Sequence, residues 1–354
     1  MQTQSKFRLL VVRLGAMGDI LHALPAVTAL RRAHPYWVID WVIEPRWSAL
    51  LSAQSATARD TTLQPIVDRL HLAPTREWRR KPLSSNTFRQ IRAFRRSLCE
   101  ASYDVVLDLQ GSIRSAIIGR MASARRRIGE AEPRESPARW LFTERVLTHG
   151  AHVIEQDIEL AAAIAGDALE PVQPLLPVDP AAEAWADALL GTSSQPAVLI
   201  NPGAGWGAKR WPPERYGTVA RELAHRGLRV FVNAGPGEVA LAGAIAQASG
   251  GTASVVVPTL EQLIAITRRV ALVIAGDTGP LHLACALDKP VVGIYGPTDP
   301  SRNGPFGSPF RVLRSPQSRR DHTRHEAPEA GLLTIQPDDV LRATAELLYP
   351  EASA

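Results

Sequence analysis

Asp19 is the first residue of this chain whose type and position could support chemistry. It ends the run Gly15-Ala16-Met17-Gly18-Asp19, which follows an apolar strand-like stretch and precedes a helix-like one. Glycines at such a turn let the backbone approach a ligand closely. An aspartate there can cap the helix, and it can also take a proton from a hydroxyl group as a general base. The residues alone leave both interpretations open.

Four turns in the second half have the composition of a phosphate-binding site. Glycines offer backbone N–H groups to a diphosphate, a lysine adds a positive charge, and a helix start adds a partial one. The turns span residues 201–212, 235–238, 276–282 and 295–300. Each turn alone could be a surface loop or a helix cap. Because all four follow successive predicted strands, together they predict a nucleotide site.

Basic residues gather in the first half of the chain. Residues 1–150 hold 24 Lys and Arg against 13 Asp and Glu, a net charge of +11, whereas the remainder holds 16 against 22, a net charge of −6. An arginine-rich solvated surface explains this asymmetry as well as an anionic partner does. Arginine binds carboxylates and phosphates through two N–H groups at once. The basic clusters contain Arg76, Arg79, Arg80 and Lys81, then residues 125–127 and Arg134.

Strand-like and helix-like segments alternate along the chain, which predicts parallel sheets with helices on both faces. Apolar strands are expected over 8–13, 37–43, 104–110, 197–201, 228–234, 253–257, 270–275 and 290–295. Helices are expected over 20–33, 214–226, 260–269 and 337–348. Pro25 either kinks the first of these helices or begins it.

A chain of 354 residues suggests two domains. The Pro- and Ala-rich stretch 166–180 separates two series of strands and is the predicted linker. We therefore expect an α/β protein with doubly wound, Rossmann-like domains over 1–178 and 179–336. Two such domains are expected to face each other across a central cleft, with ligands beyond the carboxyl ends of the strands.

Several classes of protein are disfavoured by composition. No apolar run approaches the ~20 residues of a membrane helix, and the first residues lack signal-peptide features. Cys99 and Cys285 are too few for a disulfide framework, so a cytosolic protein with free thiols is expected. His322, His325 and Glu326 lie in a polar loop; their spacing fits no strong zinc pattern, and neither a metal nor a cofactor is expected.

The motifs taken together resemble glycosyltransferase family nine, the heptosyltransferases of lipopolysaccharide assembly. The resemblance covers about residues 9–348 and rests on G-x-M-G-D-I-L-H, G-x-K-R-W-P, D-T-G-x-x-H-L and Y-G-P-T-D-P. Four segments of the first half favour the type I branch over type II. They are M-G-D-I-L-H-A-L-P-A, D-W-V-I-E at 40–44, R-x-W-R-R at 76–80 and D-L-Q-G at 108–111.

This resemblance implies a GT-B fold whose C-terminal helix, residues 337–349, returns to the first domain. It implies ADP-L-glycero-β-D-manno-heptose as donor and the Kdo residue of Kdo2-lipid A as acceptor. The first domain would bind the acceptor and the second the donor. The enzyme would act as a peripheral protein on the cytoplasmic face of the inner membrane.

The resemblance also assigns residues to roles. Asp19 matches the general base, and Lys209 matches the lysine that neutralises the donor phosphates. The expected donor-binding residues are Gly203, Gly205, Lys209, Glu238, Asp277, Thr278, Gly279 and His282. The expected acceptor-binding residues are Gly18, Arg76, Arg79, Arg80 and Arg134.

Three alternatives remain. Heptosyltransferase II or another GT-B glycosyltransferase is the nearest one. A nucleic-acid-binding protein would suit the basic first half, but the sequence shows no known module and no basic surface interleaved with aromatic residues, so no nucleic acid is expected. An NAD-dependent oxidoreductase would need the G-x-G-x-x-G turn that the chain lacks.

Overall fold

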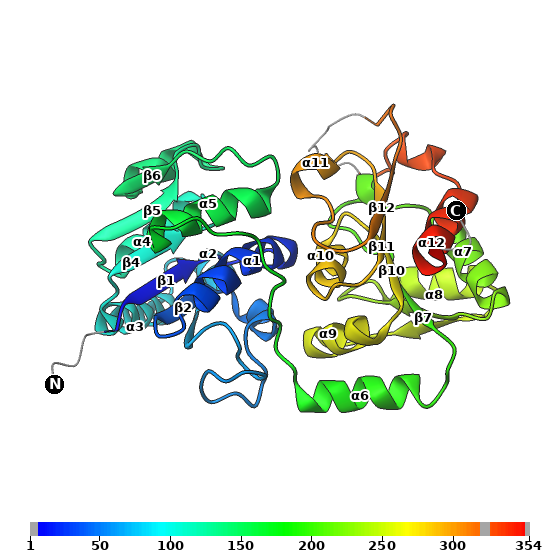
Figure 1. Cartoon of the computed structure of the whole chain (residues 1–354), viewed down its shortest axis with the longest axis horizontal. Helices are drawn as coiled ribbons and strands as arrows, with labels where there is room; N and C mark the ends of the chain where they lie inside the picture. Colours follow the sequence, from blue (N-terminus) through cyan, green and yellow to red (C-terminus); the bar gives the residue numbers. More distant parts are fainter. Residues whose placement is uncertain (1–5, 319–325, 351–354) are drawn as a thin grey trace. The chain divides into compact units, whose positions relative to one another are not determined.

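A computed structural model describes residues 6–318 and 326–350, so His322 and His325 lie outside the described residues. The chain divides into two compact units, residues 1–177 and 178–354 (Figure 1). This division lies in the predicted linker, between the end of helix α5 (Val153–Ala165) and the start of helix α6 (Pro180–Leu190). Gly166 ends α5 with a φ of 78°, a left-handed conformation that glycine adopts readily.

The first unit is built on one six-stranded sheet in which all strands run parallel. Its strand order is β3-β2-β1-β4-β5-β6, so successive strands are added to one side of β1 and then to the other. The strands are β1 (Arg8–Val12), β2 (Val38–Ile43), β3 (Arg69–Leu72), β4 (Val105–Asp108), β5 (Arg126–Glu130) and β6 (Glu144–Val146). The helices are α1 (Met17–Ala33), α2 (Thr75–Arg80), α3 (Ser85–Ala101), α4 (Ile113–Met121) and α5, with 3-10 turns η1 (Pro45–Leu50) and η2 (Ser136–Leu141).

Helix α1 is the central helix of this unit. Most of its residues are buried, and it lies beside α5 (Figure 1). The helix begins at Met17, ahead of the predicted start at residue 20, and continues through Pro25. Pro25 therefore lies inside the helix and does not begin it, and it leaves one backbone hydrogen bond of the helix unmade.

The second unit repeats the same topology. Its parallel sheet has the order β12-β11-β10-β7-β8-β9, which is the order of the first sheet when the strands of each unit are numbered from one. The strands are β7 (Ala197–Asn201), β8 (Arg229–Asn233), β9 (Ala253–Val256), β10 (Leu272–Gly276), β11 (Val291–Tyr295) and β12 (Phe310–Arg314). The helices are α6, α7 (Pro213–His225), α8 (Val239–Ala248), α9 (Leu260–Arg269), α10 (Gly279–Ala286), α11 (Pro300–Asn303) and α12 (Pro337–Leu348), with 3-10 turns η3 (Gly207–Lys209) and η4 (Leu332–Thr334).

The last helix belongs to the core of the second unit. Helix α12 packs against α7 and β12 of this unit (Figure 1). Val340, Leu341 and Ala343 are buried in the hydrophobic core of the second unit, in the same cluster as Tyr216 and Leu223 of α7. The reason is the amphipathic pattern of α12, whose apolar face completes this core.

None of the helices in the described ranges is long and apolar enough to cross a membrane.

Candidate functional site

Polar residues follow five neighbouring strands of the first sheet. Asp19 comes after β1, Glu44 after β2, Arg76 after β3, Gln110 after β4 and Arg134 after β5. The strands are parallel and adjacent in the order β3-β2-β1-β4-β5, so their carboxyl ends form one edge of the sheet. In doubly wound sheets this edge is where ligands bind. The structure therefore brings Asp19, Gly18 and the predicted acceptor arginines Arg76 and Arg134 to one edge.

Asp19 occupies the third position of α1, and the N-cap is Ala16. Its Oδ2 accepts a hydrogen bond of 2.9 Å from the backbone N–H of Ala16, and its Oδ1 lies 3.5 Å from Nη2 of Arg13. The side chain keeps 39% of its surface exposed. One carboxylate oxygen thus stabilises the helix start, while the group as a whole stays accessible, so the capping and base interpretations are compatible.

Arg13 is a candidate site residue that the sequence reasoning missed. Although it is buried, its guanidinium donates to the carbonyl oxygen of Leu109 and faces Asp19. The loop after β4 also contacts the segment after β1, since Gln110 Oε1 accepts a 2.7 Å hydrogen bond from the N–H of Leu14. The sequence could have indicated Arg13, because it is a charged residue directly after an apolar strand. A charged side chain is buried at such a place only when polar partners surround it.

Glu44 and Arg114 are two further residues that the sequence reasoning did not single out. Glu44 Oε1 accepts hydrogen bonds from the Thr75 hydroxyl group, at 2.5 Å, and from the backbone N–H of Arg76, at 3.2 Å. Arg114, at the start of α4, donates a 3.3 Å hydrogen bond to the same hydroxyl group. These contacts fix the start of α2 against the neighbouring strand ends, and they join Arg114 to Thr75, the residue before Arg76.

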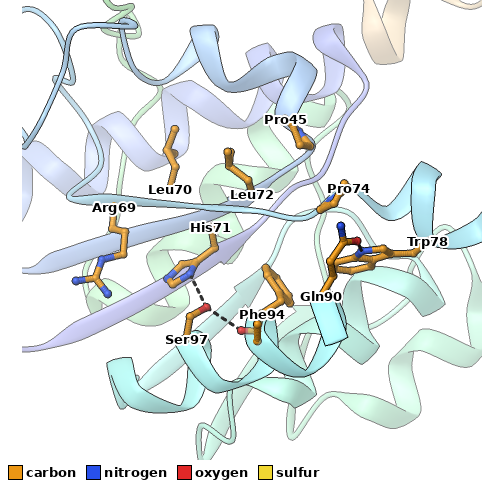
Figure 2. Close-up of a pocket in the computed structure, with 11 residues that line it drawn as sticks. Pro45, Arg69, Leu70, His71, Leu72, Pro74, Trp78, Gln90, Phe94 and Ser97 are labelled. Atoms are coloured by element: carbon orange, nitrogen blue, oxygen red, sulfur yellow. Dashed lines mark hydrogen bonds between the residues drawn. The ribbon is translucent and has the colours of Figure 1, made fainter. Parts of the chain in front are cut away.

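Arg79 and Arg80 lie on the same short helix but point into solvent. Trp78, between them and Arg76, packs on Phe94 of α3 and donates a 3.0 Å hydrogen bond to Gln90 (Figure 2). This indole fixes the orientation of α2, and both arginines are exposed. Arg134 is also exposed, and its backbone N–H lies close to Gly111, where an added Cβ would come within 3.1 Å of it.

The second unit collects the four predicted turns at one edge as well. They follow β7, β8, β10 and β11, which are neighbours in the order β11-β10-β7-β8. The two buried amides Asn201 and Asn233, at the ends of β7 and β8, share a 2.8 Å hydrogen bond. The turns therefore lie side by side, as the nucleotide-site interpretation requires.

Lys209, Asp277 and His282 form a largely buried polar cluster at this edge. The ammonium group of Lys209 pairs with Asp277 Oδ2 and lies 4.4 Å from the ring centre of Trp206. Nε2 of His282 lies 3.5 Å from Asp277 Oδ1. Burial by itself raises the pKa of Asp277, but the hydrogen bond with His282 and the charge of Lys209 outweigh it and hold the pKa well below its usual range. Asp277 is therefore ionised at neutral pH and holds Lys209 in position.

Gly203 and Glu238 lie against each other. A Cβ added to Gly203 would fall within 2.1 Å of Glu238 Oε1, so a larger residue at this position would displace the Glu238 carboxylate. Glu238 Oε2 accepts a 3.0 Å hydrogen bond from the N–H of Gly235 within the second turn, and the approach of the Glu238 carboxylate to Gly203 brings this turn against the first one. Around Gly205, by contrast, no atom of the described residues other than its chain neighbours lies within 4 Å of an added Cβ.

The start of α10 exposes backbone donors. Thr278 is the N-cap, but its hydroxyl group donates to the carbonyl oxygen of Gly276 at 3.2 Å and does not cap the helix. Gly279 is the first helical residue. The first N–H groups of a helix are free to bind an anion such as phosphate. Within the described parts of the chain, no cluster of three His, Cys, Asp or Glu side chains could hold a metal ion.

Residues 91–332 match glycosyltransferase family 9 (heptosyltransferase), which is more than half of the chain. The chain belongs to this family. It is therefore a glycosyltransferase, and its two Rossmann-like units are those of the GT-B fold.

Individual relatives cover nearly the whole of this family 9 glycosyltransferase. It is 29% identical to lipopolysaccharide heptosyltransferase 1 of Escherichia coli K12, over 88% of this chain and 94% of the relative. It is 27% identical to lipopolysaccharide heptosyltransferase 2 of the same strain, over 97% and 99%. The solved structure of E. coli heptosyltransferase WaaC with ADP superposes with a TM-score of 0.79 at 26% identity, covering 96% of this chain and all of that one.

Proposed function

We propose that this enzyme is a lipopolysaccharide heptosyltransferase I. It transfers L-glycero-D-manno-heptose from ADP-heptose to the Kdo residue of Kdo2-lipid A, a step of inner-core biosynthesis. The observation that carries the proposal is the likeness to relatives named heptosyltransferase 1 over 88% of the chain, together with the family match. A structure of the same E. coli relative with ADP-2-deoxy-2-fluoro heptose supports the choice of donor.

The second unit is proposed to bind the donor. Lys209 offers a positive charge to the diphosphate, and the helix start at Thr278 and Gly279 offers N–H groups. Because Lys209 is already paired with Asp277, its charge is partly neutralised, and the backbone donors must contribute substantially. Gly203, Gly205, Glu238 and His282 complete the proposed donor site, in which the glycines allow close approach.

The reaction is proposed to be a single inverting displacement. The acceptor hydroxyl oxygen attacks the anomeric carbon of the heptose as the bond from that carbon to the ADP oxygen breaks. ADP leaves with the electron pair, and Lys209 with the start of α10 stabilises its charge. Asp19 takes the proton from the attacking hydroxyl group during the attack, because that hydroxyl is too weak an acid to ionise beforehand.

The first unit is proposed to bind the anionic acceptor. Arg76, Arg79, Arg80 and Arg134 are exposed, and arginine pairs well with the carboxylates and phosphates of such a glycolipid. Gly18, next to Asp19 and without a side chain, is proposed to let the acceptor sugar approach. The enzyme is proposed to work at the cytoplasmic face of the inner membrane, as a peripheral protein held by its positive charge.

A product assay tests the proposal. The enzyme is incubated with ADP-heptose and Kdo2-lipid A, and the products are analysed by mass spectrometry. We expect the acceptor to gain one heptose and ADP to be released in equal amount. Absence of transfer with ADP-heptose, alongside transfer from another nucleotide sugar, would refute the donor assignment.

The same assay separates the alternative. Relatives named heptosyltransferase 2 are 27% identical, so a type II activity has support of its own. Kdo2-lipid A that already carries one heptose is offered in a parallel reaction. Transfer to this acceptor alone would make the enzyme a heptosyltransferase II.

A further inference from the structure

Helix α3 carries a basic face that the proposed transfer reaction does not use. Four exposed arginines lie on it within eight residues, and they line a surface hollow of about 470 Å³ together with Ala93 and Cys99. They are Arg89, Arg92, Arg95 and Arg96. A hollow lined by four guanidinium groups is a strong site for anions, since each group offers several N–H donors in one plane.

The opposite face of α3 explains why these arginines point outward. Phe94 and Leu98 are buried in the core of the first unit, and Gln90, Phe94 and Ser97 turn toward β3 and α2 (Figure 2). With 3.6 residues per turn, the arginines at positions 89, 92 and 96 then fall on the solvent side. The helix is therefore amphipathic, and its polar face is almost entirely cationic.

Little in the protein neutralises this charge. Arg96 lies 3.7 Å from Glu100, and Arg89 donates a 2.8 Å hydrogen bond to the neutral side chain of Asn86. Arg92 and Arg95 form no hydrogen bond or ion pair with any residue in 6–318 or 326–350. Like charges crowded on one helix repel each other, so an anionic partner would relieve this repulsion.

Two large apolar side chains stand at the start of the same surface. Leu83 is 87% exposed, and Phe88 is 59% exposed. Leu83 lies just before the first residue of α3, and Phe88 lies in its first turn. Exposed apolar groups at one end of a cationic helix are typical of helices that lie in a membrane interface, where the charges meet lipid phosphates and the apolar groups enter the acyl boundary.

We infer that the outer face of α3 docks on an anionic lipid bilayer. The arginines bind lipid phosphates in the hollow, and Leu83 and Phe88 enter the interface between headgroups and acyl chains. This inference rests on the proposed function, because a glycolipid acceptor lies in a bilayer. It adds a surface that holds the enzyme on the membrane and is distinct from the proposed acceptor arginines Arg76, Arg79 and Arg80.

Sedimentation with vesicles tests the surface. The full-length enzyme is spun with vesicles of neutral phosphatidylcholine and with vesicles containing about 30% phosphatidylglycerol. The variant R89Q/R92Q/R95Q/R96Q removes four charges from α3. The matched control, R32Q/R120Q/R125Q/R139Q, removes four charges from exposed arginines elsewhere in the first unit.

We expect the wild type and the control to bind the anionic vesicles and the α3 variant to bind them at least about 10-fold more weakly. The pair L83S/F88S should weaken binding with all charges retained. An equal loss of vesicle binding in the α3 variant and the control would show that only the overall charge matters, and it would overturn the inference. So would a variant that binds vesicles normally but loses affinity for an oligonucleotide, since the face would then suit nucleic acid.

Transfer to a water-soluble, deacylated Kdo2 acceptor is the second readout. We expect the α3 variant to keep its rate, because it remains folded and its acceptor arginines are intact. If the α3 variant loses both this activity and its melting transition, it has unfolded. Vesicle binding by L83S/F88S then tests the docking surface by itself. If no form of the enzyme transfers heptose while the vesicle result holds, the proposed function fails and the docking surface stands.

Discussion

The carboxylate of Asp19 makes two separate contacts through its two oxygens. One oxygen accepts the N–H of Ala16, and the other faces Arg13 at 3.5 Å. The Asp19→Asn variant keeps an oxygen for the helix start but removes the base. We expect a folded, donor-binding enzyme that turns over about 10²–10⁴-fold more slowly. The measurement is the initial rate of ADP release at saturating substrates beside a melting curve, and near wild-type turnover would leave Asp19 as a helix-stabilising residue only.

Lys209 is expected to matter for both donor binding and stability. Replacing it by alanine removes a charge-assisted contact, so ADP affinity should fall by about 1–3 kcal/mol in calorimetry. The same change leaves the buried carboxylate of Asp277 without its cation, which should lower the melting temperature.

A second variant separates these two effects of Lys209. In K209A/D277N the uncompensated charge is gone, so stability should recover while donor affinity stays low. Recovery of ADP binding in this double variant would show that Lys209 acts on the fold alone.

Asp157 on α5 predicts a pH dependence of stability. Burial raises its pKa to about 7, against a lowering by Arg13 and a further rise from Asp19 and Glu130. Its Oδ2 has no hydrogen-bond partner among the described residues. In the unfolded chain the pKa returns to about 3.9, so the folded state binds the proton more tightly. The free energy of unfolding should therefore fall as pH rises from about 4 through 7.

The Asp157→Asn variant tests this pH dependence. It should be more stable than the wild type at pH 8, by an amount on the order of 4 kcal/mol, and should lose the advantage near pH 4. Urea unfolding at a series of pH values measures the difference. Asp167→Asn, at an exposed carboxylate just after α5, is the control and should change little. An unchanged pH profile in Asp157→Asn would assign the dependence to other groups.

At the scale of elements, the apolar face of α12 packs into the core of the second unit. Leu341 is buried between α12 and the rest of the second unit's core, so Leu341→Ala should cost about 2–5 kcal/mol of unfolding free energy. The neighbouring Arg342 is exposed, and Arg342→Ala should change stability by less than about 0.5 kcal/mol.

Hydrogen exchange locates the damage caused by Leu341→Ala. Protection should fall in α7 and β12, which contact α12, while β1 and β4 of the first unit keep theirs. Loss of protection in the first unit would instead indicate that α12 packs on that domain, as the family resemblance implies.

On the scale of the whole molecule, charge is divided between the two halves, at +11 for residues 1–150 and −6 for the remainder. Binding of Kdo2-lipid A should therefore weaken when ionic strength is raised from about 0.05 M to about 0.5 M, because salt screens exposed charges. R76A/R79A/R80A should bind the acceptor more weakly at low salt and respond less to added salt. ADP affinity of this variant serves as the control and should not change; salt-independent acceptor binding would contradict the prediction.

Several features of this protein are local and were accessible from sequence. Apolar strands followed by glycine-containing turns predicted the alternation of strands and helices, the linker near residues 166–180 and the turns that hold Lys209 and Asp277. The strands β3, β5, β6 and β12 were not predicted. They lie toward the edges of their sheets and contain charged residues such as Arg69, Arg126 and Glu144, because a strand near an edge needs no continuous apolar run.

Other features depend on residues far apart in the chain, and only the tertiary structure decided them. Lys209 pairs with Asp277, Arg13 reaches the carbonyl of Leu109, and Glu44 holds the start of α2, each across at least 31 positions. The place of α12 in the core of the second unit is of the same kind, since the sequence shows the apolar face of this helix but not the residues that cover it. Local pattern specifies which face of an element is buried, but the partner of that face depends on how the sheets are assembled.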